Sequence, residues 1–115
     1  MKELEEVMSQ LQAQNQQLQG IMSQKQSYMM QIHEVEKALE HLAVAKGRKV
    51  YRAVGPVIIE ASADEVRKEL EENREDMDLR MKTLETQEEK TKKKMKETQK
   101  KFQDMAESYR AGQGG

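Results

Sequence analysis

Lys49-Val50-Tyr51-Arg52-Ala53-Val54-Gly55-Pro56-Val57-Ile58-Ile59-Glu60-Ala61 is the stretch that decides the fold. It lies near the middle of the chain and contains the only proline. Val54-Gly55-Pro56-Val57 is typical of a two-residue hairpin turn, because Gly55 adopts φ > 0 at no steric cost and Pro56 presets φ near about −65°. The flanking residues are rich in β-branched side chains and short enough for strands. The sequence therefore predicts a β-hairpin over residues 49–61.

This hairpin needs more apolar cover than the chain can supply. An isolated hairpin is marginally stable in water, and the consecutive Val57, Ile58 and Ile59 place apolar side chains on both faces of their strand. No third strand-like segment is present, and the flanking arms are polar. We therefore expect other subunits to cover the hairpin; the alternative is a hairpin packed on its own helices. The expected assembly residues are Val50, Tyr51, Val54, Gly55, Pro56, Val57, Ile58 and Ile59.

The composition suits long helices with narrow apolar seams better than a thick globular core. The 115 residues are 36% charged and 3% aromatic, with no Trp and one Phe, which amounts to a single domain over residues 1–115. The net charge of −1 indicates no general affinity for nucleic acid or membranes. The chain has no cysteine, no signal-peptide core and no apolar run near the about 18 residues of a membrane span. We therefore expect a cytoplasmic protein.

Residues 2–46 form the first predicted helix, since good helix formers dominate and Gly47 follows as a helix C-terminal glycine. Its expected seam comprises Leu4, Met8, Leu11, Leu18 and Met22, with Asn15 at the intervening position, then Tyr28, Ile32, Val35, Leu39 and Leu42. Between Leu18 and Tyr28 the frame slips, and Lys25 falls near the seam. Such a slip predicts local overwinding or unwinding of a supercoil.

Residues 63–110 form the second predicted helix, and residues 111–115 a flexible tail. Ser62-Ala63-Asp64-Glu65 is a capping-box pattern, in which the side chains of Ser62 and Glu65 each bond the other residue's backbone amide. The expected seam is apolar near the hairpin, polar in its middle and apolar again at its far end. It comprises Val66, Leu70, Met77, Met81, Leu84, Glu88, Thr91, Met95, Thr98, Phe102, Met105 and Tyr109.

Two arms of similar length joined by a compact hairpin favour an antiparallel coiled coil, with both termini at a distal tip. Helix ends fray, so apolar side chains at this tip are expected to be partly exposed, and such patches mark interaction sites. Methionine is flexible and suits the binding of many shapes. The alternative is a seam that simply continues to its end. The expected binding residues are Leu4, Val7, Met8, Leu11, Phe102, Met105 and Tyr109.

The sequence predicts neither an enzyme nor a cofactor or metal site. His33 and His41 are the only histidines and are more simply solvated helix residues than metal ligands. No glycine-rich phosphate loop follows a strand, and the carboxylates lie on exposed helix faces without a cleft. The basic run from Lys90 to Lys101 directly follows acidic residues and lacks interleaved aromatics, which favours a solvated face over a nucleic-acid site.

The chain resembles the beta-class subunit of prefoldin, a hexameric co-chaperone, over almost its whole length. A single hairpin is similar to the shorter beta class rather than the alpha class. The residues that carry the resemblance are Gln24-Lys25-Gln26, Lys37-Ala38-Leu39-Glu40, the hairpin Val50-Tyr51-Arg52-Ala53-Val54-Gly55-Pro56-Val57, Leu70-Glu71-Glu72, Leu79-Arg80-Met81-Lys82-Thr83-Leu84-Glu85 and Gln87-Glu88-Glu89.

The resemblance implies a hexamer of two alpha-class and four beta-class subunits, with the hairpins in a double β-barrel body and coiled coils hanging from it. It also implies an ATP-independent holdase whose tips hold non-native polypeptides and pass them to a group II chaperonin. The polar seam at Glu88, Thr91 and Thr98 departs from the pattern that the resemblance implies. From the residues alone, a structural coiled-coil spacer that binds a folded partner is the competing hypothesis.

Overall fold

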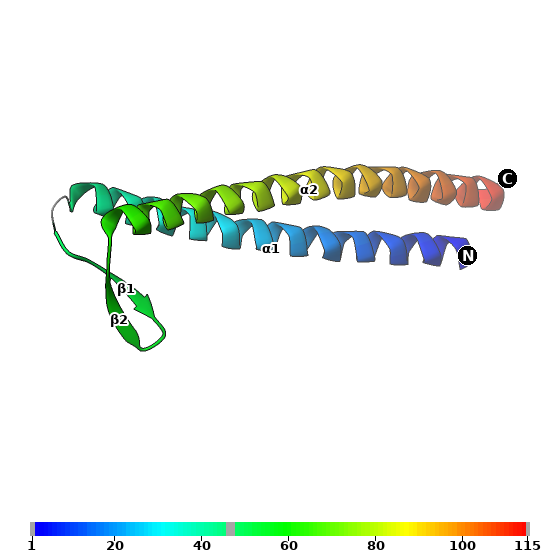
Figure 1. Ribbon diagram of the computed structural model, residues 1–115. Coiled ribbons are helices and arrows are strands. Elements are labelled where there is room, and N and C mark those ends of the chain that lie inside the picture. The colour runs from blue at the N-terminus through cyan, green and yellow to red at the C-terminus, as the bar shows by residue number, and fades with distance from the viewer. Residues whose placement is uncertain (1, 46–47, 115) are drawn as a thin grey trace. The chain divides into compact units, whose positions relative to one another are not determined.

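A computed structural model describes residues 2–45 and 48–114 as two long helices joined by one β-hairpin. The order is α1 (Lys2–Val44), β1 (Val50–Val54), β2 (Val57–Ala61) and α2 (Ala63–Gly114), as Figure 1 shows. This confirms the predicted fold class. The contacts divide the chain into two units, which we call the terminal unit (up to Lys25 and from Thr83 onward) and the hairpin unit (Gln26 to Lys82). Both chain ends therefore belong to the terminal unit.

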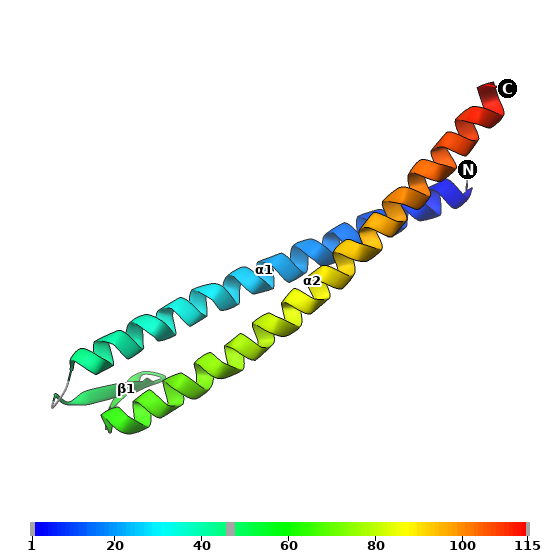
Figure 2. The ribbon, with the colours of Figure 1, turned by 90° about the horizontal axis from the view of Figure 1, so that it is seen from above.

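In each unit, a segment of α1 runs beside a segment of α2 in the opposite direction (Figure 2). Ion pairs join the two helices within each unit: Lys25 to Glu88 in the terminal unit, and Glu36 to Arg74 in the hairpin unit. The antiparallel arrangement of the arms follows from these pairs, because residues later in α1 meet residues earlier in α2. That residues 1–115 form a single domain stays a prediction.

The end of α1 lies close to the predicted position. The helix ends at Val44, where Lys46 was expected, and the amide of Ala45 still donates to the carbonyl of His41 at 3.1 Å. The predicted C-terminal glycine, Gly47, lies outside the described residues, as does Lys46.

The start of α2 at Ala63 agrees with the sequence, but the predicted capping box is not formed. The carbonyl of Ser62 accepts the amide of Val66 at 3.0 Å, whereas within residues 48–114 no hydrogen bond joins the side chains of Ser62 and Glu65 to each other's amides. Asp64 instead pairs with Arg67 at 3.1 Å, one turn along the helix. The first turn is thus stabilised by its acidic residues and this local pair.

The far end of α2 extends beyond the prediction. We expected a flexible tail from Ala111, but the helix continues to Gly114. Ala111 is the strongest helix former, and each added residue of a long helix gains a hydrogen bond without a new nucleation step. The same segment contains Gly112 and Gly114, each of which costs about 1 kcal/mol relative to alanine in a helix.

The buried face of α1 follows one unbroken heptad frame. Its least exposed positions alternate between spacings of three and four residues and comprise Leu4, Val7, Leu11, Gln14, Leu18, Ile21, Lys25, Tyr28, Ile32, Val35, Leu39 and Leu42. The predicted seam is therefore wrong at Met8, Asn15 and Met22, which are exposed, and the predicted slip after Leu18 does not occur. Val7 and Ile21 each precede an apolar methionine, so hydrophobicity alone did not separate the two frames.

The seam of α2 agrees with the prediction from Val66 to Met105. Every predicted position in that range is buried or half-buried, and Leu84, Thr91 and Thr98 are the most buried. Tyr109, the last predicted position, is exposed. The heptad frame of α2 is thus correct, and it includes the polar middle that the sequence indicates.

Candidate assembly and binding surfaces

The hairpin closes through Gly55 and Pro56. The two strands are antiparallel, with Val54 paired to Val57. Gly55 has φ +58°, and no non-glycine residue of the described chain has a positive φ, so only the first central residue of the turn lies in the left-handed region. This is the pattern of a type II′ turn, whose twist matches that of the strands. A Cβ on Gly55 would meet nothing within 4 Å, so backbone conformation rather than crowding requires the glycine.

The strand register puts apolar side chains on both faces of the hairpin. Alternation along the strands groups Val50, Arg52, Val54, Val57, Ile59 and Ala61 on one face, and Tyr51, Ala53, Ile58 and Glu60 on the other. Ile58 is 72% exposed, and Tyr51, Val54, Val57 and Ile59 are each at least half exposed. The chain thus covers neither face of its own hairpin, which argues against a hairpin packed on its own helices.

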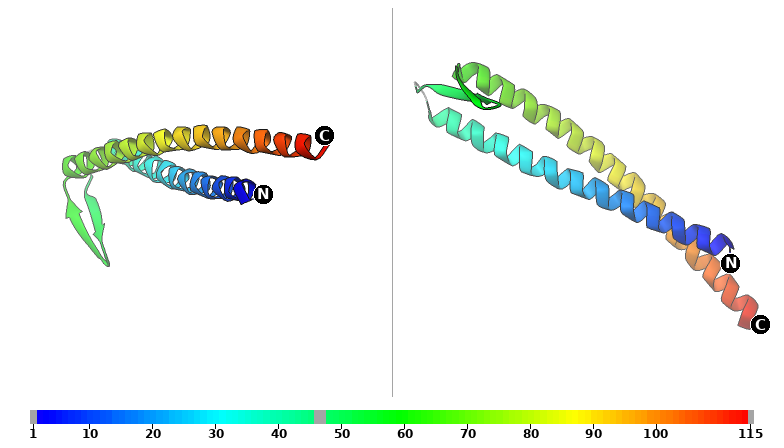
Figure 3. Two further views of the ribbon diagram at one scale, coloured as in Figure 1. Left: turned by 90° about the vertical axis from the view of Figure 1, so that its right-hand side faces the viewer. Right: turned by 90° about the horizontal axis from the view of Figure 1, so that it is seen from below.

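One contact ties the middle of β1 to the helix that follows. The guanidinium of Arg52 on β1 donates to the Glu69 carboxylate on α2 at 2.7 Å. Both side chains are largely exposed, so this pair orients the strands more than it stabilises them, at about 0–1 kcal/mol. Figure 3 shows the strands leading away from the helices of the hairpin unit. Among the described residues, both edges of this two-stranded sheet lack a partner strand, which leaves backbone groups open to further pairing.

The predicted tip residues lie together in the terminal unit but differ in burial. Val7 is only 4% exposed, whereas Met8 is 51% exposed and Tyr109 is also exposed. The remaining four, Leu4, Leu11, Phe102 and Met105, are half-buried. In this structure, therefore, part of the apolar surface of the tip is exposed to solvent. The rest, and Val7 in particular, is buried in the seam.

Two shallow hollows lie between the arms at this tip. One, of about 410 Å³, is lined by Glu3, Glu6, Val7, Gln10, Lys101 and Met105. The other, of about 390 Å³, is lined by Glu3, Asp104, Met105, Ser108 and Tyr109. Met105 borders both hollows, and its neighbours mix apolar with charged groups. The tip surface is therefore amphipathic, not purely apolar.

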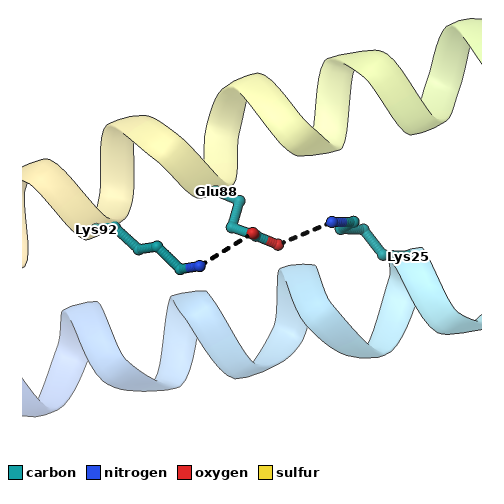
Figure 4. A network of polar contacts seen from close by, with 3 residues as sticks. All are labelled: Lys25, Glu88 and Lys92. Atoms are coloured by element: carbon teal, nitrogen blue, oxygen red, sulfur yellow. Dashed lines mark hydrogen bonds and ion pairs between the residues drawn. The ribbon is translucent and has the colours of Figure 1, made fainter.

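A charged cluster sits inside the seam of the terminal unit (Figure 4). The ammonium of Lys25 on α1 donates to Glu88 Oε2 on α2 at 3.1 Å, and Lys92 donates to Glu88 Oε1 at 3.2 Å. The side chains of Lys25 and Glu88 are only 22% and 17% exposed. The hydrogen bond from Lys25, and then that from Lys92, lowers the pKa of Glu88 below its ordinary value. Glu88 thus stays ionised between two cations.

Other polar groups share this seam. Thr91 and Thr98 are buried, and the Thr98 hydroxyl donates to the Lys94 carbonyl at 2.9 Å. Gln14 occupies a seam position of α1, and its Oε1 atom is buried without a hydrogen-bond partner in the described chain. Unpaired buried amides are costly, so the seam of the terminal unit is less stable than its length suggests.

The hairpin unit carries an apolar patch that the sequence reasoning did not single out. A hollow of about 530 Å³ is lined by Gln26, Met29, Met30, Ile32, His33 and Glu36 on α1. Met29 and Met30 are both more than half exposed and lie outside the seam. The signal that could have identified them is a pair of adjacent methionines, of which a single seam can bury at most one.

His33 and His41, the candidate metal ligands considered above, are exposed on α1. Over residues 2–45 and 48–114, no group of three or more His, Asp or Glu side chains is placed to hold a metal ion. Neither described helix is long and apolar enough to cross a membrane. In the basic run of α2, Lys92 is engaged with Glu88.

An exposed, two-faced hairpin carried on an antiparallel helix pair defines a class of coiled-coil subunits that complete their β-structure by assembly. A single hairpin cannot close a barrel, so any barrel forms between subunits. The chain belongs to the prefoldin subunit family, whose model matches residues 5–109. The resemblance that the sequence indicated is thereby confirmed.

Similar proteins include two archaeal chains named prefoldin subunit beta. The one from Archaeoglobus fulgidus is 36% identical over 104 residues, which is 90% of each chain. The one from Thermococcus onnurineus is 34% identical over 102 residues, which is 88% of each chain. The crystal structure of the prefoldin beta subunit from Thermococcus strain KS-1 superposes with a TM-score of 0.85 at 31% identity, covering 91% of this chain and 93% of that one. The family consists of non-enzymatic chaperone subunits, and prefoldin beta subunits assemble with other prefoldin subunits.

Proposed function

We propose that this chain is the beta-class subunit of a hexameric, ATP-independent holdase that captures non-native polypeptides at its coiled-coil tips and delivers them to a group II chaperonin. Two alpha-class and four beta-class subunits make up the proposed hexamer, which acts in the cytoplasm. The observation that carries the proposal is the uncovered hairpin, because a chain that exposes both faces of the one sheet found in its described residues is incomplete by itself.

The tip supports the capture step. Met8 and Tyr109 are exposed, Met105 borders two hollows, and charged residues surround them. A flexible, amphipathic surface binds many apolar segments weakly and without strong selection. Several tips held by one assembly then add their weak contacts through effective concentration. The substrate-binding residues in this proposal are those predicted from the sequence: Leu4, Val7, Met8, Leu11, Phe102, Met105 and Tyr109.

The test combines assembly with suppression of aggregation. The chain is mixed with an alpha-class prefoldin subunit, and native mass is expected to report a mixed hexamer with four copies of this chain. A tip variant in which Leu4, Met8, Phe102 and Met105 are replaced by Ser is then expected to assemble normally but to suppress aggregation of a denatured protein poorly. The matched control replaces Met22 and Met30 with Ser, since both are exposed methionines of α1 away from the tip.

Full suppression by the tip variant would reject the tip as the capture site. A stable dimer that ignores the alpha-class partner would instead favour the structural spacer. Delivery is tested separately: a fluorescent substrate held by the hexamer should move to an added group II chaperonin in the absence of nucleotide. Transfer that requires ATP would contradict the proposed mechanism.

A further inference from the structure

The terminal unit holds an ion pair between its two arms. The other residues of this seam do not favour one register of the arms over another. Lys25 occupies a heptad position of α1, and Glu88 occupies one of α2. Their charged atoms are 3.1 Å apart, and both side chains are more than three-quarters covered. Lys92 holds the second oxygen of Glu88 and thereby fixes the orientation of the carboxylate (Figure 4). Polar groups at seam positions are the best-attested devices for specifying register in coiled coils.

The other seam residues of this unit discriminate poorly between registers. They are mostly Leu, Met and Thr, which accommodate one another at any offset of whole heptads. A slip of one heptad in one direction puts Met95 in place of Glu88 beside Lys25. A slip in the other direction puts Leu18 in place of Lys25 beside Glu88. Either slip separates Lys25 from Glu88 and places a largely covered charge opposite an apolar residue of the other arm, which is unfavourable.

We propose that Lys25 and Glu88 are positioning residues that lock the register of the two arms of the terminal unit. Lys92 keeps Glu88 in the geometry that Lys25 requires. The pair thus selects one of several apolar alignments that are otherwise similar in energy. It also acts against pairing of α1 with the wrong partner, since Lys25 then lies in the seam without the carboxylate of Glu88 opposite it.

The register decides which side chains meet at the tip. The hollow lined by Val7, Lys101 and Met105 exists because residues from the two ends of the chain lie at one level. A slip of one heptad would bring Val7 to the polar region around Thr98, or beyond Met105 toward the end of α2. The consequence for capture rests on the proposed function, whereas the register lock itself does not.

Cross-linking tests the register directly, because the chain has no cysteine of its own. Val7 lies opposite Lys101 and Met105, and counting along the antiparallel helices from there puts Leu18 opposite Thr91. A cross-link between Leu18→Cys and Thr91→Cys therefore reports the native register. Leu18→Cys with Thr98→Cys, or with Leu84→Cys, reports a slip of one heptad in either direction. Each pair is oxidised in the full assembly, in the parent sequence and in a Lys25→Leu, Glu88→Leu background.

In the parent sequence the native pair is expected to cross-link and the slipped pairs to remain at background. In the Leu–Leu background the slipped pairs should rise about tenfold, since the penalty that excludes them is gone. The matched variant Lys25→Glu, Glu88→Lys, Lys92→Glu reverses every charge of the cluster and keeps both ion pairs. It should restore the native cross-linking pattern.

A Leu–Leu variant that cross-links only in the native register would overturn the proposal, as would a charge-reversed variant that slips. The reversed variant also covers the case in which the Leu–Leu chain fails to assemble. Suppression of aggregation is measured on the same samples. If the register slips while suppression is unchanged, the lock stands and the proposed tip site is wrong.

Discussion

Glu88 is the residue whose protonation matters most to the folded arms. The hydrogen bonds from Lys25 and Lys92 lower its pKa below the ordinary value of 4.5. A folded-state pKa below the unfolded one stabilises the fold above that ordinary value, and the stabilisation is lost as the pH falls through 4.5 toward the folded pKa. We therefore expect the parent protein to lose melting temperature in this range faster than Glu88→Gln, which cannot titrate.

Melting curves followed by circular dichroism between about pH 7 and about pH 3 measure this difference. Glu89→Gln, an exposed neighbour outside the seam, controls for the change of net charge. A melting-temperature gap between the parent and Glu88→Gln that stays constant with pH would contradict the assignment.

Gln14 offers a second test on a single residue. Its buried Oε1 atom lacks a hydrogen-bond partner in the described chain, so an apolar side chain of similar size should fit the seam better. We expect Gln14→Leu to raise the free energy of unfolding by about 1 kcal/mol or more. Urea denaturation measures the gain, and Asn15→Leu, at the exposed neighbouring position, should change stability by about 0.5 kcal/mol or less. Equal effects at the two positions would show that the gain comes from hydrophobicity alone.

At the scale of the element, substitutions at Ile21 and Met22 test the heptad frame of α1. Ile21 is 6% exposed and Met22 is exposed, although the sequence frame favoured Met22. We expect Ile21→Ala to lower the free energy of unfolding by about 2–4 kcal/mol, because it removes buried methyl groups and leaves a cavity. Met22→Ala should cost about 0.5 kcal/mol or less. Chemical denaturation measures the free energy of unfolding of both variants. A larger loss for Met22→Ala than for Ile21→Ala would favour the frame with the predicted slip.

Local chemistry explains which elements could be predicted. The hairpin follows from Gly55-Pro56 between β-branched residues, and the α2 seam from the heptad spacing of the apolar positions on either side of its polar middle. In α1, Val7-Met8 and Ile21-Met22 offer two equally apolar frames, and only the partner helix selects between them. The Lys25–Glu88 pair was missed for the same reason. A lysine near a seam looks like a defect until the opposite arm supplies its carboxylate.

The tip was harder to predict than the hairpin. Composition and position indicated which apolar residues gather there, and they do lie in one unit. Sequence spacing could not reveal that Val7 is buried while its neighbour Met8 is exposed. Nor could it indicate that Glu3 and Asp104 border the hollows beside Met105. Burial at a helix end depends on how the two arms meet, which is set by contacts distant in sequence.

At the scale of the whole molecule, the prediction concerns Ile58. It is 72% exposed in the isolated chain and lies on the hairpin face opposite Arg52. In the proposed hexamer this face is covered, so Ile58→Asp would bury an unpaired charge at the assembly surface. We expect the native mass to fall to that of smaller species while the helical circular-dichroism signal persists. Ile58→Val, which keeps the surface apolar, should still assemble, and a hexamer formed by Ile58→Asp would reject the hairpin as the assembly element.

The unbroken heptad of α1 also gives the arms an adjustable reach. Since the seam repeats every seven residues, removing residues 11–17 together with residues 92–98 would join like positions in both helices and shorten each by about 10 Å. The same cut in one arm alone would misalign the two arms from the cut to the chain ends, including Val7 and Met105 at the tip. The length of such a coiled coil can therefore change in evolution only by whole heptads that are lost or gained in both helices at once. The sequences that encode the two helices must then change together.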